Sequence, residues 1–212
     1  MALTLGQMET RVRRVLRDKG GKFVTKAEVI ELLNEAQLEI ATRTLCIQVE
    51  ATGTFTTYQL ALPSTYIGGA SLRVGTEIDD VEWVDNETFD SWRRGGEDPP
   101  HTIGRIFAGN FEVYPTPDVG EAYTLRYAKT PTILDDDADT AQVMPVYEQN
   151  MIAYARAHAK LKDGETGEYE AYMSMFDKGL PETMGPTTNF KPGPMNLRYE
   201  PGPFDTADAG HL

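Results

Sequence analysis

The spacing of apolar residues changes twice along the chain, and this change constrains the fold more than any other feature. Residues 1–44 and 145–180 repeat apolar side chains every three or four positions, which is the period of an amphipathic helix. Residues 45–144 instead hold short runs of β-branched and aromatic residues, separated by Gly, Pro, Asn and Asp. The sequence therefore predicts an α+β fold in which a β-rich module is inserted between two helical segments.

Each helical segment is expected to form a hairpin of two helices. The first holds two capping boxes, Thr4 with Gln7 and Thr25 with Glu28, each at the start of an apolar stripe. The second begins at Pro145, a residue suited to a first helical turn, and a glycine divides it. The two hairpins are predicted to pack as a four-helix bundle with the β module projecting from one end. The expected stripes are Leu5, Met8, Val12, Val15 and Leu16; Val29, Leu33, Ala36 and Ile40; Tyr147, Met151, Tyr154, His158 and Leu161; and Tyr169, Tyr172, Met173 and Phe176.

The middle segment is expected to form a small antiparallel sandwich or barrel. Its strand candidates are short and closely spaced, and Ala108-Gly-Asn110 between two of them is typical of a hairpin turn. A short helix near 86–93, capped by Asp85 or Asn86, is expected to interrupt the strands. The strand candidates cover 47–51, 55–62, 70–75, 81–84, 103–108, 110–114 and 122–129.

The last segment, 181–212, differs from the rest of the chain. It holds six Pro and four Gly and shows no helical or strand period, yet apolar residues are spread along it. We predict an extended C-terminal arm that becomes ordered on a partner, with plain disorder as the alternative. The predicted partner-binding anchors of this arm are Met184, Phe190, Met195, Leu197, Tyr199 and Phe204.

The sequence offers no catalytic, metal or cofactor site. It has no P-loop, dinucleotide fingerprint or hydrolase motif, and one cysteine with three widely separated histidines argues against a zinc site. The aspartates of 135–139 start like a calcium loop, but Thr140 and Val146 occupy the positions that need Gly and Glu. No apolar run approaches the ~18 residues of a membrane span. We therefore predict a protein that is not an enzyme, binds no cofactor and does not enter a membrane.

Five segments resemble phage head–tail adaptor proteins in their order and spacing. They are Asn34-Glu-Ala-Gln-Leu-Glu-Ile-Ala41, Tyr58-Gln-Leu-Ala-Leu-Pro63, Ile106-Phe-Ala-Gly-Asn-Phe-Glu-Val-Tyr-Pro-Thr-Pro-Asp118, Leu125-Arg-Tyr127 and Met144-Pro-Val-Tyr147. The chain is thus similar, over roughly residues 4–180, to the tail tubular protein A or gateway group below the portal of short-tailed phages. It is also similar to adaptors of some long-tailed phages.

The resemblance implies a helical bundle with a β-rich insertion that assembles as a dodecameric ring without catalytic residues. Such a ring docks below the portal protein, extends the DNA channel and receives a tail or nozzle protein. It is made in the cytoplasm of the bacterial host and resides at the head–tail interface of the virion. Two alternatives stay open: a head-completion or tail-terminator ring protein, and a small carbohydrate-binding or hydrolytic protein built on the β module.

The charge distribution gives the ring hypothesis a further expectation. The net charge is −13, and residues 77–98 hold nine acidic and two basic side chains. Because each basic contact to DNA phosphates adds affinity, an acidic or neutral lumen would let DNA pass without specific binding. We expect this acid to come from 77–98 or 135–139, and the arginines of the first helix (Arg11, Arg13, Arg14 and Arg17) to face protein neighbours or carboxylates.

Overall fold

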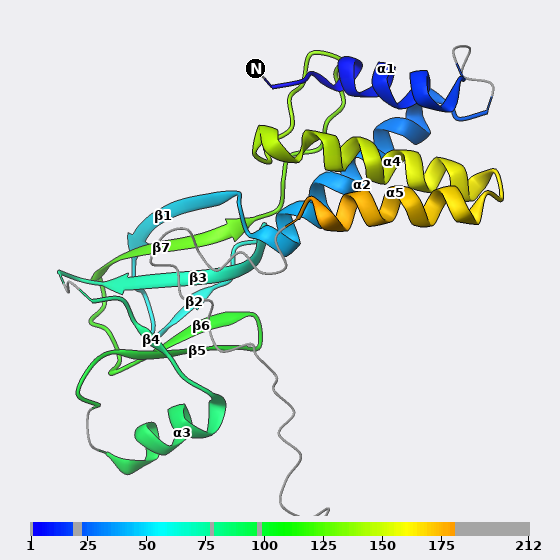
Figure 1. The fold of residues 1–212 in the computed structure, drawn as a ribbon. Helices are drawn as coiled ribbons and strands as arrows, with labels where there is room; N and C mark the ends of the chain where they lie inside the picture. The colour runs from blue at the N-terminus through cyan, green and yellow to red at the C-terminus, as the bar shows by residue number, and fades with distance from the viewer. Residues whose placement is uncertain (1, 19–22, 77–78, 97–98, 181–212) are drawn as a thin grey trace, which may run out of the picture.

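The computed structural model describes residues 2–18, 23–76, 79–96 and 99–180 (Figure 1). These residues form an α+β fold, as predicted, with four helices at one end and two open sheets at the other. The chain crosses to the sheets after α2 and returns to the helical part for α4 and α5. In chain order the elements are α1 (Leu5–Leu16), α2 (Lys26–Thr44), β1 (Gln48–Thr54), β2 (Gln59–Ala61), β3 (Tyr66–Val74), β4 (Glu82–Trp83), α3 (Asn86–Gly95), β5 (Ile103–Phe107), β6 (Asn110–Tyr114), β7 (Ala122–Lys129), the 3-10 turn η1 (Pro145–Tyr147), α4 (Glu148–Lys162) and α5 (Thr166–Lys178).

Both predicted capping boxes are present. The hydroxyl of Thr4 accepts the N–H of Gln7 at 3.3 Å, and the Gln7 side chain accepts the N–H of Thr4 at 3.1 Å. Thr25 and Glu28 exchange the same pair of bonds at 3.2 and 2.8 Å. Each box satisfies two N–H groups that a helix start leaves without backbone partners, so both helices begin directly after the predicted cap.

Four helices share one apolar core, and α4 lies in its middle. α4 packs against α1, α2 and α5, so it is covered on several sides. For this reason its alanines at 153, 155, 157 and 159 are all buried, although the predicted stripe omits them. The residues correctly predicted as core are Leu5, Met8, Val12, Val29, Leu33, Ala36, Ile40, Tyr147, Met151 and Phe176.

Two members of the predicted stripes are exposed. Val15 and Leu161 are 39% and 44% exposed, since each is in the last turn of its helix. The turn at Gly164 (φ 78°) leaves the end of the α4–α5 hairpin open to solvent. The burial expected of Leu161 as a stripe residue is therefore wrong, whereas Tyr154 packs across the hairpin, with its ring centroid 5.2 Å from that of Phe176.

The middle segment forms two sheets with strand orders β1-β7-β3 and β2-β6-β5-β4. All pairs are antiparallel except β4 with β5, so the expectation of a purely antiparallel module is wrong at this edge. The physical reason is α3, which follows β4 and returns the chain to the start of β5, as a parallel pair requires. Side chains from both sheets form a second core: Phe55, Ala70, Leu72, Val74, Val81, Phe111, Val113, Leu125 and Tyr127.

The turn between β5 and β6 is the predicted hairpin. Phe107 pairs with Asn110, and the two residues between them, Ala108 and Gly109, have φ values of 49° and 79°. Two successive positive φ values give a two-residue turn the twist of its flanking strands. The predicted cap of α3 is Asp85, whose carboxylate accepts the N–H of the third helical residue at 2.8 Å.

Residues 130–144, called the connector below, return the chain from β7 to α4. The side-chain amide of Asn34 on α2 donates to the carbonyl of Leu134 at 3.0 Å and accepts its N–H at 2.8 Å. A single side-chain amide thus forms hydrogen bonds with both the N–H and the carbonyl of Leu134, as a neighbouring strand would. This pairing holds the connector against α2.

Gln37, one helical turn further along α2, holds the connector at two more points. Its side chain is buried, donates to the carbonyl of Thr132 at 3.0 Å and accepts the N–H of Gln142 at 2.7 Å. The side chain of Gln142 closes the loop by accepting the N–H of Thr132 at 3.0 Å. The two halves of the connector are therefore joined to each other and to α2.

Candidate interaction surfaces

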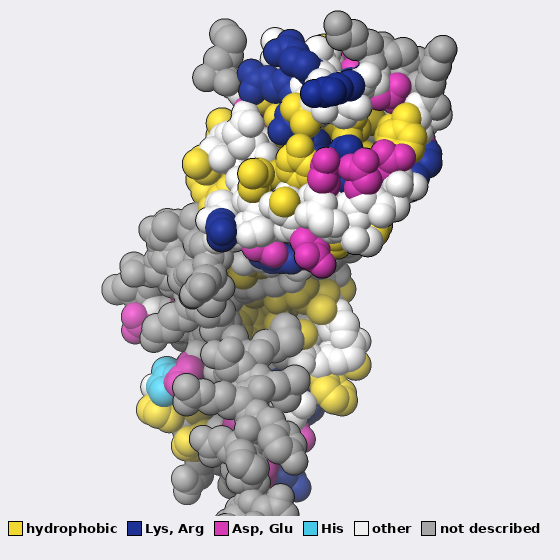
Figure 2. All heavy atoms as spheres, turned by 45° about the vertical axis from the view of Figure 1, so that its right-hand side comes forward, with side chains coloured by type: hydrophobic (Ala, Val, Ile, Leu, Met, Phe, Trp, Pro, Cys, Tyr) yellow, Lys and Arg dark blue, Asp and Glu magenta, His cyan; other side chains and the backbone are white. Residues whose placement is uncertain are grey.

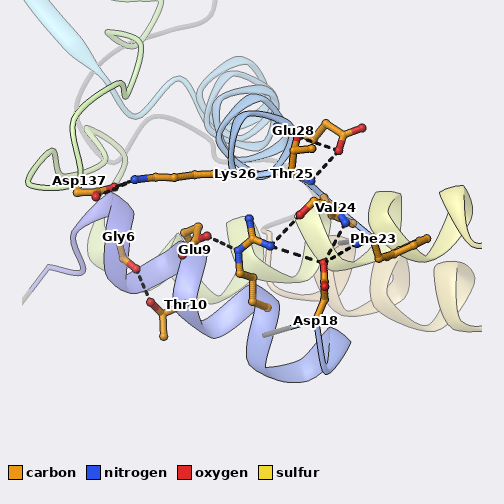
Figure 3. A network of polar contacts seen from close by, with 11 residues as sticks. Gly6, Glu9, Thr10, Asp18, Phe23, Val24, Thr25, Lys26, Glu28 and Asp137 are labelled. Carbon is orange, nitrogen blue, oxygen red and sulfur yellow. Dashed lines mark hydrogen bonds and ion pairs between the residues drawn. The ribbon is translucent and has the colours of Figure 1, made fainter. Parts of the chain in front are cut away.

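Arg13 is the arginine of α1 that the fold itself uses. It forms ion pairs with Glu9 and, at 3.6 Å, with Asp18, and it donates to the carbonyl of Val24 at 2.7 Å. Figure 3 shows these three groups converging between α1 and the start of α2. The expectation that an arginine of the first helix faces carboxylates is confirmed for Arg13, which fastens α1 to α2.

The other three arginines of α1 and its C-cap have no such partners among the described residues. Arg14 and Arg17 are exposed and Arg11 is half-buried. Within the described part of the chain, no carboxylate lies in ion-pair range of any of them. Figure 2 shows dark-blue side chains gathered at the top of the molecule, where α1 lies. We call Arg11, Arg14 and Arg17 the basic face of α1.

Arg156 on α4 extends this positive charge towards the core. It donates to the carbonyl of Arg11 at 3.0 Å, and its Nε is buried without a hydrogen-bond partner in the described structure. Burial lowers the pKa of Arg156, and the charge of Arg11 lowers it further. Positive charge is therefore concentrated where α1 meets α4, and a negative group from outside would stabilise it.

α2 carries the opposite charge on its exposed side. Glu31 and Glu35 lie one turn apart, are exposed, and have no basic side chain in ion-pair range among the described residues. Leu38, 45% exposed, continues the same side of the helix. We call Glu31, Glu35 and Leu38 the α2 stripe.

The aspartate run has a structural role at the start of α1. Asp139 accepts the N–H groups of Asp135 and Asp136 at 2.9 Å each, and these bonds lower the pKa of Asp139. The carbonyls of Asp137 and Asp139 accept the first two N–H groups of α1, at 3.1 and 2.7 Å. The Asp137 carboxylate also pairs with Lys26 at 2.7 Å. Part of this acid is thus used inside the subunit.

The acidic block 77–98 is divided in a similar way. Asp80 binds Ser71 at 2.7 Å and lies 3.6 Å from Arg73, while Asp90 binds Arg105 at 2.9 Å. Residues 77–78 and 97–98 lie outside the described part. Whether acid from this block or from 135–139 lines a channel stays a prediction.

Arg105 is a buried charged residue that sequence reasoning missed. It pairs with Glu112 at 2.7 Å, and its guanidinium lies over the rings of Phe89 and Phe107 at 4.5 and 4.7 Å. Together with its bond to Asp90 on α3, this arrangement fixes α3 to the β5–β6 hairpin. The charges are satisfied within the subunit, so the cluster has the character of a structural clamp.

Several exposed apolar side chains lie on the connector and on η1, which follows it. Ile133 and Val146 are 74% and 69% exposed, and Met144 lies between them in sequence and is also exposed. Met175 of α5 and Leu38 of α2 are further exposed apolar residues of the helical part. Burial of such side chains in a protein–protein contact would remove apolar surface from water.

The predicted arm and its six anchors lie outside the described residues. Over the ranges that the structure does describe, no group of three or more His, Cys, Asp or Glu side chains is placed to hold a metal ion. None of the described helices combines the length and the apolar character needed to cross a membrane.

Comparison with known proteins gives one family. The chain matches the SU10 adaptor protein family over residues 3–198, which includes every described helix and strand and the first part of the predicted arm. The resemblance drawn from sequence stopped near residue 180, so the family match extends further. No curated protein matches the chain. The match covers most of the sequence, and the chain therefore belongs to the SU10 adaptor protein family: it is a phage head–tail adaptor, a structural protein and not an enzyme.

Proposed function

We propose that this chain forms the ring-shaped head-to-tail adaptor of a phage virion. The ring is a dodecamer that docks below the portal protein, extends the DNA channel and receives the tail or nozzle protein. The observation that carries the proposal is the family match over residues 3–198. In this proposal the helices act as a four-helix bundle that forms the body of each subunit, and the β module is a sandwich that projects from it.

The surface of the helical part supports a role in assembly. Exposed apolar side chains lie on the connector, α2 and α5, and charges without a partner in the described part of the chain lie on α1 and α2. A subunit that met only water would gain nothing from exposing Ile133 and Val146 at more than two thirds of their surface. Contacts with portal, tail and neighbouring subunits would bury such groups.

The net charge supports passage of DNA without binding. A chain at −13 gains little from counterion release on a phosphate backbone, so duplex DNA would slide through the ring. Its location in this proposal is the head–tail interface of the virion, after synthesis in the cytoplasm of the bacterial host.

The arm supplies a second proposed contact. Its anchors, Met184 to Phe204, would order on a neighbouring subunit, the portal or the tail protein. We expect a chain truncated after residue 180 to keep its thermal unfolding midpoint but to assemble less well with portal. Equal assembly of the truncated and full chains would contradict this role.

Native mass spectrometry of the purified chain, alone and mixed with its portal protein, tests the proposal. We expect a complex that contains portal and a ring of adaptor subunits. Binding to a tail-tube end without binding to portal would instead identify a tail terminator. Absence of any complex with either partner would refute an adaptor role for this chain.

A further inference from the structure

We infer that the basic face of α1 binds the α2 stripe of a second copy of this chain, forming a subunit contact of the ring. This inference rests on the proposed ring. A ring of identical subunits related by rotation uses a heterologous contact, in which two different patches of the same chain meet. Such a chain must carry two surfaces that complement each other and that can be used at the same time.

The two surfaces complement each other in charge. The basic face holds three arginines, and the α2 stripe holds two glutamates. None of these five side chains has an oppositely charged partner among the described residues, although nearby charges such as Arg13 and Lys160 are paired within the subunit. In a chain with net charge −13, the unpaired arginines of α1 are a local exception. An acidic surface of another copy would compensate them.

The spacing and composition of the surfaces also agree. Arg11 and Arg14 are separated by about 4.5 Å along α1, with Arg17 following at its C-cap, and Glu31 and Glu35 by about 6 Å along α2, so two helices lying side by side can match both pairs. Each surface has one exposed apolar side chain next to its charges, Val15 on α1 and Leu38 on α2. An apolar centre bordered by charged groups is the usual composition of a specific protein interface.

The fold leaves both surfaces accessible at once. α1 and α2 each pack against α4, and the buried residues of both helices belong to the same core. Their exposed sides therefore point away from this shared core. One subunit can present α1 to one neighbour and the α2 stripe to the other, as a closed ring requires.

Duplex DNA is the competing occupant of the basic face, because phosphates also attract arginine. DNA would leave Glu31 and Glu35 without a role, whereas contact with another copy uses both surfaces. The two cases differ in what the glutamates do, so paired charge reversal separates them.

The test uses the full chain and reverses each surface in turn. R14E/R17E reverses the basic face, E31R/E35R reverses the α2 stripe, and the combined variant exchanges the two charges. The matched control is R93E/R94E, which makes the same change in net charge at two exposed arginines in the last turn of α3. Self-association is measured by sedimentation at low and high salt, and ring formation by native mass spectrometry with portal.

We expect R14E/R17E and E31R/E35R each to weaken self-association by roughly tenfold or more, because like charges then face each other. The combined variant should regain most of the wild-type association, and R93E/R94E should match wild type. Salt should weaken the wild-type association. If R14E/R17E lowers the melting temperature, the neutral R14Q/R17Q variant is used, which should weaken association by less.

Several results would overturn the inference. One is an equal loss in R14E/R17E and in the control, and another is failure of the combined variant to regain association. A third is loss of duplex DNA binding in R14E/R17E with self-association unchanged. If every variant forms the ring on portal as wild type does, the proposed function stands and this contact is wrong. If wild type itself forms no ring on portal, the proposed function fails, and this contact with it.

Discussion

Replacement of Gln37 by leucine should destabilise the whole subunit, because this side chain joins the connector to α2. Gln37 is 1% exposed and makes two hydrogen bonds to connector backbone, at 3.0 Å to Thr132 and 2.7 Å to Gln142. Leucine has a similar volume and makes neither bond. Each such bond contributes about 1 kcal/mol net. Thr132 and Gln142 lie near solvent, so water can replace part of the loss, and we expect Gln37→Leu to cost about 1–3 kcal/mol.

Urea unfolding measures this cost, and Glu31→Leu on the exposed side of the same helix is the control. We expect the control to stay within about 0.5 kcal/mol of wild type, as surface substitutions usually do. The backbone N–H of Gln142 should also exchange with solvent faster in Gln37→Leu than in wild type. A cost below about 0.5 kcal/mol with unchanged exchange of that N–H would refute the role given to Gln37.

In a Gln37→Glu variant, the hydrogen bonds from this side chain to Thr132 and Gln142 should depend on pH. A protonated carboxyl group at this position can donate to the Thr132 carbonyl and accept the Gln142 N–H, whereas a carboxylate cannot donate. Folding therefore favours the protonated form and raises the pKa of the introduced carboxyl group above its value in the unfolded chain. The stability of this variant relative to wild type should be highest at low pH and fall as pH rises through that raised pKa. A variant whose stability relative to wild type does not change with pH would contradict this geometry.

Three further predictions concern single contacts. Gly179→Ala should cost about 1–3 kcal/mol in urea unfolding, because its Cβ would overlap the Asn150 amide nitrogen, which caps α5; the cost should fall in an Asn150→Ala background. Leu161→Ala should change stability by less than about 0.5 kcal/mol, since Leu161 is half exposed, whereas Met151→Ala should cost about 2–5 kcal/mol. The hydrogen bond from Lys162 lowers the pKa of Glu28 from 4.5 to about 2. Ionised Glu28 should therefore stabilise the fold above pH 4.5, and this stabilisation should be lost as pH falls towards 2. An E28Q variant whose stability falls as much as that of wild type between pH 4.5 and pH 2 would contradict this prediction.

The elements were predictable where their signals are local. Capping boxes, a proline in the first turn of a helix and a two-residue glycine turn depend on neighbours in sequence, and each is found where predicted. The α4 alanines were missed because their burial depends on which helices surround α4. The parallel pairing of β4 was missed because two residues carry no directional signal, and the crossover through α3 decides it.

The polar side chains that hold the modules together could not be predicted from sequence. Asn34, Gln37 and Arg105 are polar or charged residue types, which are mostly exposed in proteins, so sequence reasoning treats them as ordinary surface positions. The partners of Asn34 and Gln37 are distant along the chain, 100 residues away for Asn34 and 95 and 105 for Gln37, whereas Arg105 pairs with Glu112 and Asp90, which are 7 and 15 residues away. A single sequence contains no signal for such pairs, so only the folded arrangement shows that these side chains are buried and bonded.

The position of these bonds also decides how force would pass between the two parts of the subunit. The chain joins the helical part to the sheets twice, once directly after α2 and once through the connector. Because Asn34 and Gln37 fix the connector to α2, both crossings are held by the same helix. A load applied to the β module by a tail protein would therefore reach α2 first, and α2 also carries the stripe that we place against the next subunit. Loosening the connector in Gln37→Leu should then weaken ring formation on portal as well as stability.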